Sequence, residues 1–268
     1  MKIASWNVNS LKVRLPHLEE WLKLAQPDIV ALQETKLEDH VFPDAAIAAL
    51  GYQCVHSGQK TYNGVAVLAR SAPRDPLAAI PGFADEQRRV LAVTVGTVRV
   101  VNLYVVNGQA VGSDKYAYKL EWMRAVAQWL RAEAANHPEL VVLGDFNVAP
   151  EDRDVHDPEA WREQVLCSTP EREALRAIMD AGLHDTYRLF DYLRNEKPDL
   201  VFNIVECIEN ESILEMNVAG VYELLKIPYT GAGPLALGTA LNKPRVKEIL
   251  LYHGIRTPQF QVFHAEEK

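Results

Sequence analysis

The sequence lacks the features that define several classes of protein. None of its 268 residues lies in an apolar run of 18 or more, and the amino-terminal segment MKIASWNVNS becomes polar within about five residues. We therefore expect neither a membrane span nor a signal peptide. The three cysteines, Cys54, Cys167 and Cys207, are too few and too widely spaced for a disulfide framework or a zinc site. They are typical of reduced thiols, so we expect a cytoplasmic protein.

A surplus of positive charge is also missing. The formal net charge is −8, so the chain has no global basic footprint for nucleic acid. This weakens a nucleic-acid hypothesis without excluding it, because a metal ion can offset a carboxylate-lined site and local Lys or Arg clusters can hold a backbone. Neither an internal repeat nor a low-complexity segment is present, and 48% hydrophobic residues suffice for a sizeable core.

What the sequence does contain is an ordered series of strands and helices. Short apolar runs broken by Gly and Pro predict strands over 2–8, 27–34, 52–57, 64–70, 89–95, 98–106 and 140–147. Helical periodicity predicts helices over 15–25, with Pro16 in the first turn, over 113–137, with Ser113 or Asp114 as N-cap, and over 169–182. The mostly hairpin-sized gaps between strands indicate an α+β protein with antiparallel sheets flanked by helices.

The pattern changes from Tyr192 onward. A strand is predicted over 197–206, an amphipathic helix over 211–225, and two helical pieces divided at Pro244 over 235–255. This order of strand and helix is typical of a short α/β segment, so we place a domain boundary between residues 191 and 192.

Three predicted strands end in polar side chains. Asn7 closes IASWN, Glu34 closes IVALQE, and Asp145 with Asn147 closes VVLGDFN. In a layered fold, neighbouring strand ends converge on one rim, where sites are built. A carboxylate with supporting amides suits Mg²⁺, which can offset charge as a phosphodiester is attacked. A second carboxylate can then orient or deprotonate the attacking water.

Each of these residues also has a purely structural interpretation. A strand-end Glu34 is often solvated, Asn7 favours turns, and GDFN could be a tight turn in which Asp145 accepts backbone hydrogen bonds. Four polar groups at three strand ends are harder to explain as separate turns, which favours a shared site.

Five segments, taken together and in order, resemble the exonuclease III family of Mg²⁺-dependent DNA repair nucleases: WNVNS (6–10), LQETK (32–36), YNGVAVLAR (62–70), NLYVVNGQ (102–109) and LGDFNVAP (143–150). The match is collinear over about residues 1–191, and QKTYNG and KYAYK favour the DNA-acting branch. The resemblance implies two packed antiparallel β-sheets flanked by helices in a four-layer sandwich. It also implies Mg²⁺, with Mn²⁺ as a substitute, double-stranded DNA as partner, a monomer, and no tightly bound organic cofactor.

The resemblance implies a role for each residue of the rim. The implied metal ligands are Glu34 and Asn7, and the implied catalytic residues are Asp145 for the water, Asn147 for the scissile phosphate, Tyr104 for the developing charge and Asn107 in support. The alternative for Tyr104 is an aromatic residue of the core. Val106 stands where the family often has Pro, which loosens the comparison of this loop.

The same resemblance implies contacts to backbone phosphates that hold DNA without reading its sequence. The candidates are Lys36, Asn63, Arg88, Arg89, Lys115 and Lys119. For any single one of them, the alternative is ordinary solvated surface charge.

The resemblance ends after DTYRLF (185–190). The family continues there with a W-x-D-Y-R segment, a strand carrying Asp then His, and a closing S-D-H-A-P loop, none of which occurs here. The missing His contacts the phosphoryl centre, and loss of such a charge-stabilising donor lowers rates on the order of 10²–10³-fold. We therefore expect an incomplete sandwich with weak or no turnover.

Residues of about 193–262 instead resemble a fragment of D-alanine–D-alanine ligase-like ATP-grasp enzymes. The predicted organisation is thus a nuclease domain over 1–191, without its last strands, and a ligase-like α/β fragment over 192–268. Three hypotheses follow: a phosphodiesterase acting at 3′ ends or abasic sites of duplex DNA, a non-catalytic fusion that binds metal or DNA, and a nucleotide-binding ligase fragment. The third is disfavoured because the ATP-grasp nucleotide loop and metal carboxylates would lie beyond Lys268.

Overall fold

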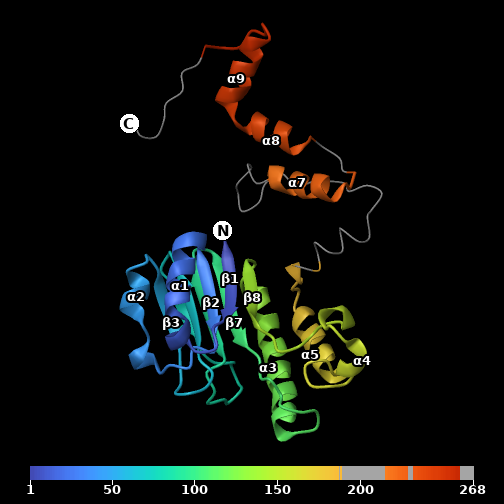
Figure 1. The fold of residues 1–268 in the computed structure, drawn as a ribbon. Coiled ribbons are helices and arrows are strands. Elements are labelled where there is room, and N and C mark those ends of the chain that lie inside the picture. Colours follow the sequence, from blue (N-terminus) through green and yellow to red (C-terminus); the bar gives the residue numbers. More distant parts are fainter. Residues whose placement is uncertain (187, 189–214, 229–231, 260–268) are drawn as a thin grey trace. The chain divides into compact units, whose positions relative to one another are not determined.

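The computed structural model of the chain describes residues 1–186, 188, 215–228 and 232–259. It separates into two compact units, Met1–Leu183 and His184–Lys268, and each is described here by itself (Figure 1). Within the described part of the chain, every helix is too short or too polar to serve as a membrane span.

The first unit contains two four-stranded sheets. The first has the order β1-β2-β4-β3, with β1 (Ile3–Asn7), β2 (Ile29–Gln33), β3 (Gln53–Ser57) and β4 (Val65–Ala69). The second has the order β5-β6-β7-β8, with β5 (Arg74–Leu77), β6 (Val90–Val95), β7 (Val98–Tyr104) and β8 (Leu140–Asp145). The α+β class and the pair of sheets are confirmed.

The prediction that both sheets are antiparallel is wrong, because each sheet contains one parallel pair. Strands β1 and β2 run parallel, as do β7 and β8, whereas the other pairs are antiparallel. The physical reason is the connection: α1 (Leu11–Ala25) links β1 to β2, and α3 (Asp114–Asn136) links β7 to β8. A helical crossover returns the chain in its original direction, whereas a short turn reverses it.

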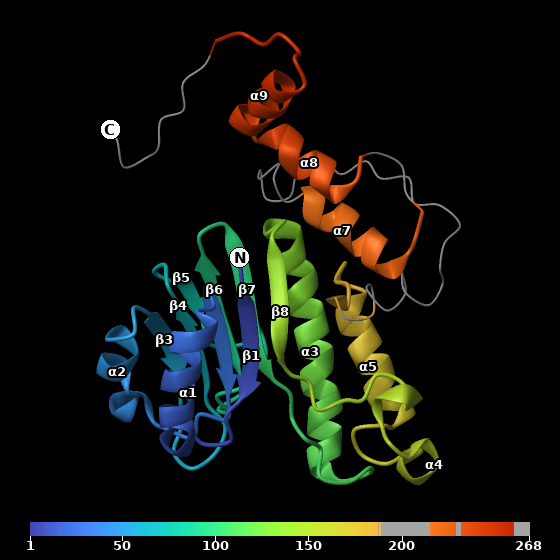
Figure 2. The same cartoon turned by 45° about the horizontal axis from the view of Figure 1, so that its top comes forward.

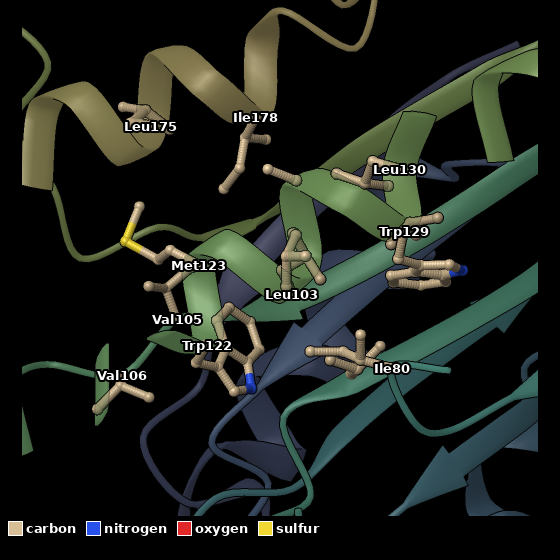
Figure 3. Close-up of a cluster of buried hydrophobic side chains, with 14 of the residues drawn as sticks. Ile80, Leu103, Val105, Val106, Trp122, Met123, Trp129, Leu130, Leu175 and Ile178 are labelled. Carbon is tan, nitrogen blue, oxygen red and sulfur yellow. The ribbon is translucent and has the colours of Figure 1, made fainter. Parts of the chain in front are cut away.

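The layers of this unit are visible in Figure 2. Helix α1 and the short α2 (Asp44–Ala48) cover the outer face of the first sheet, and apolar side chains fill the space between the sheets. Helix α3 covers the second sheet, and α5 (Thr169–Met179) packs on α3. Figure 3 shows Trp122 and Met123 of α3 in this cluster with Leu103 of β7 and Leu175 and Ile178 of α5. The remaining short helices are η1 (Asp39–Val41), η2 (Asp152–Asp154) and α4 (Pro158–Trp161).

The starts of the two long helices test the capping predictions. Helix α1 begins at Leu11, so Pro16 lies inside the helix and its predicted place in the first turn is wrong. Leu11 is fully buried with Leu18 on the face that meets the sheet, so apolar burial extends the helix toward the amino terminus. The predicted cap of α3 is confirmed, because the hydroxyl of Ser113 accepts a hydrogen bond from the backbone N–H of Tyr116 at 3.2 Å.

A buried polar contact ties the two sheets together. The side-chain amide of Asn102, in β7, donates to the carbonyls of Leu32 and Ala66 in the first sheet, both at 2.9 Å. Its oxygen accepts a hydrogen bond from Gln33, the last residue of β2, at 2.7 Å. Because buried polar groups require such partners, this contact fixes the register of one sheet against the other near their polar strand ends.

The described part of the second unit contains α7 (Glu215–Leu225), α8 (Pro234–Leu241) and α9 (Lys243–Tyr252). The two predicted helical pieces are present, but they divide at Asn242 rather than at Pro244: Asn242 caps α9 by accepting from the N–H of Arg245 at 3.1 Å, and Pro244 lies in the first turn of α9. The predicted strand over 197–206, Cys207 and the boundary at 191/192 lie outside the described residues, so the α/β order and the ligase-like interpretation stay predictions. Cys54 and Cys167 are free thiols.

Candidate active site

The polar strand ends meet at one edge of the first unit. Asn7 ends β1 opposite Gln33 of β2, and Tyr104 ends β7 opposite Asp145 of β8. Since both pairs are parallel, the side chains that follow these positions emerge at the same edge of each sheet. Glu34 directly follows Gln33, so the two sheets deliver their carboxylates side by side.

The amide of Asn7 joins the two carboxylates. Its Nδ2 donates to Oε1 of Glu34 at 2.9 Å and to Oδ2 of Asp145 at 2.8 Å. Its Oδ1 accepts from the backbone N–H of Asn9 at 3.0 Å. Residues 27 and 138 positions apart from Asn7 are thus held within one hydrogen-bonded group, as the sequence predicted.

Glu34 is surrounded by hydrogen-bond donors. Tyr104 donates its hydroxyl to Oε1 at 2.7 Å, and the ammonium of Lys36 lies 2.9 Å from Oε2. Burial by itself raises the pKa of Glu34, but the hydrogen bonds from Asn7, Tyr104 and Lys36 outweigh it, and the pKa falls below its ordinary value. The carboxylate is therefore ionised at neutral pH.

The backbone of Glu34 is held in a left-handed conformation, with φ of 54°. Few non-glycine residues adopt this conformation, and it persists where surrounding contacts over-determine it. Here the carbonyl of Glu34 accepts from the N–H of Ser10 at 2.8 Å, and the N–H of Thr35 donates to Gly64 at 3.1 Å. Hydrogen bonds on both sides of the chain therefore fix the direction in which the carboxylate points.

The apolar run of β8 ends before Asp145 because position 144 requires glycine. The φ of Gly144 is 147°, and a Cβ at this position would lie 1.9 Å from the carbonyl oxygen of Leu103 on β7. Only glycine permits this close approach, so β8 continues its pairing with β7 up to Asp145. Asn147 then turns the chain with φ of 48° and donates its backbone N–H to Oδ1 of Asp145 at 3.1 Å.

Two amides stand beside Asp145. Asn147 donates from its side chain to the carbonyl of Val105 at 2.9 Å, and the exposed Asn107 donates to Oδ1 of Asn147 at 3.4 Å. The loops that follow β7 and β8 are therefore connected through their asparagines. Both predicted catalytic amides lie at the same edge as the carboxylates.

Tyr104 is half-buried, with its hydroxyl at the site and its ring in the protein. Burial, and then the hydrogen bond to Glu34, raise the pKa of Tyr104 above its ordinary value, so the hydroxyl remains a neutral donor. The guanidinium of Arg89 lies 4.6 Å from the centroid of the ring and donates to the carbonyl of Tyr104 at 3.2 Å. This cation–π contact and hydrogen bond hold the ring in place.

The predicted DNA contacts differ in how far their side chains are exposed to solvent. Arg88 and Lys115 are exposed, whereas Asn63 is 7% exposed and donates to Gln59 and Gln87 at 3.0 and 3.2 Å. The side chain of Lys36 is 28% exposed and lies in the site, paired with Glu34.

Two predicted contacts require correction. Arg89 is 5% exposed because it stacks on Tyr104, and Lys119 is 0% exposed because its ammonium is paired with Glu171 inside the protein. Neither side chain presents its charge to solvent, so the direct phosphate contact predicted for each is wrong. Spacing along a helix or strand locates a basic residue but does not reveal whether a buried acid neutralises it.

The oxygen atoms at this edge already accept a cation. The ammonium of Lys36 lies 2.9 Å from Glu34 Oε2 and 2.5 Å from Oδ1 of Asn9. Among the described residues, no cluster of three or more His, Cys, Asp or Glu side chains is arranged to hold a metal. One carboxylate with amide oxygens is instead the kind of ligand set that Mg²⁺ accepts while it keeps several waters. Glu34 and Asn9, which already face the ammonium of Lys36, therefore fit this ion. Asn7 turns its Nδ2 toward Glu34 and its Oδ1 toward the N–H of Asn9, so it would offer its oxygen to a metal only after its side-chain amide flips.

Sequence reasoning missed four contributing residues. Asn9 reaches the site through Lys36, and the repeated Asn of WNVNS was the available signal. Gln33 and Asn102 position the sheets behind the site, but inside a predicted strand each looks like an ordinary polar residue. Glu171 pairs with Lys119 across 52 residues, which no local pattern indicates.

Residues 4–193 match the model of the Endonuclease/Exonuclease/phosphatase family. The chain belongs to this family. Its members are metal-dependent nucleases that generally use Mg²⁺. The matched range ends two residues after the domain boundary predicted at Asp191.

Individual members of the family show the same similarity. Exodeoxyribonuclease III of Haemophilus influenzae is 31% identical over 209 residues, which cover 74% of this chain and 78% of that protein. The 3′ phosphatase NExo from Neisseria, in a structure bound to product DNA hairpin, is 49% identical with a TM-score of 0.70, covering 70% of this chain and 74% of that one. An AP endonuclease from Archaeoglobus fulgidus is 32% identical with a TM-score of 0.68, covering 78% and 80%. The predicted exonuclease III resemblance is confirmed.

Proposed function

We propose that the edge formed by Glu34 and Asp145 hydrolyses phosphate esters at 3′ ends or abasic sites of double-stranded DNA, with Mg²⁺ bound. The observation that carries this proposal is the amide of Asn7, which donates to both carboxylates, at 2.9 and 2.8 Å. The similar proteins, an exodeoxyribonuclease III, a 3′ phosphatase bound to a DNA hairpin and an AP endonuclease, support this substrate class.

The metal and the two carboxylates would divide the chemistry. Mg²⁺, held by Glu34 with Asn7, would supply charge neutralisation at a phosphate oxygen, and Mn²⁺ would substitute for it. Both oxygens of Asp145 are held by donors, Oδ2 by Asn7 and Oδ1 by the N–H of Asn147, so the carboxylate keeps one orientation. In that orientation, Asp145 positions the attacking water and accepts its proton.

Neutral donors would stabilise the charge that develops on the phosphate. Tyr104 offers a hydroxyl that stays protonated, and Asn147 and Asn107 offer side-chain amides at the same edge. Preorganised donors of this kind are each worth on the order of 10²–10³ in rate. The ring of Tyr104 is already fixed by Arg89, so little reorganisation is needed as the reaction proceeds.

Backbone phosphates of the duplex would contact Lys36, Asn63, Arg88 and Lys115. Such contacts position DNA without reading its sequence, and exposed Arg88 and Lys115 are the more accessible of them. We further propose a cytoplasmic monomer without a tightly bound organic cofactor.

The test uses the full-length protein and one duplex prepared in three forms, with a recessed 3′ hydroxyl, a 3′ phosphate or a central abasic site. We expect Mg²⁺-dependent cleavage that EDTA abolishes and added Mg²⁺ restores, and the form cut fastest identifies the substrate. Glu34→Ala should abolish cleavage, whereas Glu121→Ala, an exposed acid on α3, should not change it. Cleavage that survives Glu34→Ala would reject the assigned site.

A second candidate is a protein that binds metal or DNA without turnover. One observation favours it: residues 192–268 contain no Asp followed by His, the pair that the family resemblance requires at the phosphoryl centre. Fluorescence anisotropy with the same duplexes distinguishes the two functions. Tight, salt-dependent binding with no cleavage at enzyme excess would support the binding protein, and Mg²⁺-dependent cleavage would exclude it.

A further inference from the structure

We propose that Lys119 and Glu171 are positioning residues that hold the loops of Asn107 and Asn147 in place beside Asp145. This inference rests on the proposed function, because it assigns the two asparagines to the reacting phosphate. Lys119 lies in α3 and Glu171 in α5, and neither contacts solvent.

The ammonium of Lys119 connects the two loops of the site. It donates to the carbonyl of Asn147 at 2.6 Å and to the carbonyl of Asn107 at 3.3 Å, and it is paired with Oε1 of Glu171. One charged group thus fixes the backbone of both asparagines, whose side chains are joined by a hydrogen bond. Gly108 leaves room for it, since a Cβ there would lie 3.1 Å from Cδ of Lys119.

Glu171 is itself held from several directions. Its Oε1 also accepts from the N–H of Leu166 at 3.0 Å, and its Oε2 accepts from the N–H and the hydroxyl of Ser168 at 3.2 and 2.6 Å. The hydroxyl of Ser168 lies 2.6 Å from that of Tyr116, one turn before Lys119 on α3. The two helices and the two loops therefore share one polar network built around a fully buried ion pair.

Stability alone is a poor reason for such a pair. Removing two charges from water is expensive, and buried ion pairs can often be replaced by apolar residues without loss of stability. A cap for α5 would not need the lysine, because Ser168 and Glu171 form a capping box by themselves. What the ammonium adds is a pair of hydrogen bonds to the loops that carry Asn107 and Asn147.

The decisive variant is Lys119→Met with Glu171→Gln. It removes the ammonium but leaves no uncompensated buried charge, and the glutamine retains the capping box. Lys119→Met alone leaves Glu171 unpaired, so its melting temperature should fall and that of the double variant should recover. Arg131→Met removes an exposed charge from the same helix and serves as the control.

We expect kcat of the double variant to fall on the order of 10–100-fold at nearly unchanged KM, because misplacement by about 1 Å costs up to about 10²-fold. The recovered melting temperature would show that the loss is not one of folding. Recovery of kcat together with the melting temperature would reduce the pair to a structural role and overturn the proposal.

A second readout does not require activity. In protein labelled with ¹⁵N asparagine, the side-chain amide signals of Asn107 and Asn147 should move in the double variant, while that of buried Asn102 should not. Unmoved signals would overturn the positioning role even in an active enzyme. If the wild-type protein cleaves no DNA, the proposed function fails, yet this measurement still decides the positioning. Should the double variant not fold, Glu171→Gln alone is judged by the same signals.

Discussion

Each of the two sheets of the first unit has one carboxylate at the end of its parallel pair of strands. The two carboxylates differ in their hydrogen-bond and ion-pair partners. Glu34, from the first sheet, is paired with the ammonium of Lys36 and accepts from Tyr104. Asp145, from the second sheet, accepts from the neutral amides of Asn7 and Asn147. A carboxylate that already faces a cation is suited to holding a metal, and one held by neutral donors is suited to orienting water.

The comparison shows that the two sheets contribute different functions to the site. The first sheet supplies the cation side, with Asn7, Glu34 and Lys36, and the second supplies the water and phosphate side. The amide of Asn7 crosses between them. Substitutions on the two sides should therefore lose activity in different ways.

The largest effect is expected for Asp145→Asn. Without a carboxylate to orient and deprotonate the water, kcat should fall on the order of 10³-fold, and added Mg²⁺ should not restore it. Initial rates on the preferred duplex across a Mg²⁺ series measure this. A loss smaller than about tenfold would remove Asp145 from the role of base.

Glu34→Gln should lower kcat by a smaller factor, and this loss should depend on the Mg²⁺ concentration. The amide keeps the shape of the side chain but loses the charge, so kcat at limiting Mg²⁺ should fall on the order of 10²-fold. Higher Mg²⁺ should recover part of the rate. A Mg²⁺ dependence identical to that of the wild type would contradict the assignment of Glu34 to the cation side.

Asn102→Leu tests the contact that holds the two sheets in register. It leaves Gln33 and the carbonyls of Leu32 and Ala66 without their partner, so the free energy of unfolding should fall by about 2 kcal/mol. This corresponds to roughly a 30-fold change in the folding equilibrium. Urea titration measures it, and Asn136→Ala, an exposed amide on α3, is the control. Equal stability of the two variants would refute the role of the buried contact.

Arg89→Lys should have the smallest effect on turnover. Lysine keeps the charge but loses the planar stack on Tyr104, so we expect kcat to fall about tenfold at unchanged KM. The neighbouring Arg88→Lys provides the contrast, since a phosphate contact changes KM and the salt dependence of binding instead. If the two variants behave alike, Arg89 does not position Tyr104.

Much of this site could be predicted because strand-end polar residues leave a local signal. Asn7, Glu34, Asp145 and Asn147 each follow a recognisable apolar run, and they lie together as expected. The predictions that failed concern residues whose environment is set by contacts distant in sequence. The pattern of Lys119 is that of an exposed helical lysine, and only the packing of α5 on α3 buries it against Glu171.

The errors in the fold have a similar origin. Seven of the eight strands of the first unit were predicted, but β2 runs parallel to β1 because α1 is a crossover connection, and the periodicity of each strand alone does not reveal its direction. Strand β5 was missed because Arg74–Leu77 contains Asp75 and Pro76 and only one apolar residue facing the core. It forms because β6 offers an edge with which it can pair.

The most direct test of the shared site is the rate of the doubly substituted Glu34→Gln/Asp145→Asn protein at limiting Mg²⁺, compared with each single variant. Residues that act as one unit are strongly non-additive, so the double variant should be at most about threefold slower than Asp145→Asn alone. Rate losses that multiply, as for two independent sites, would contradict the account.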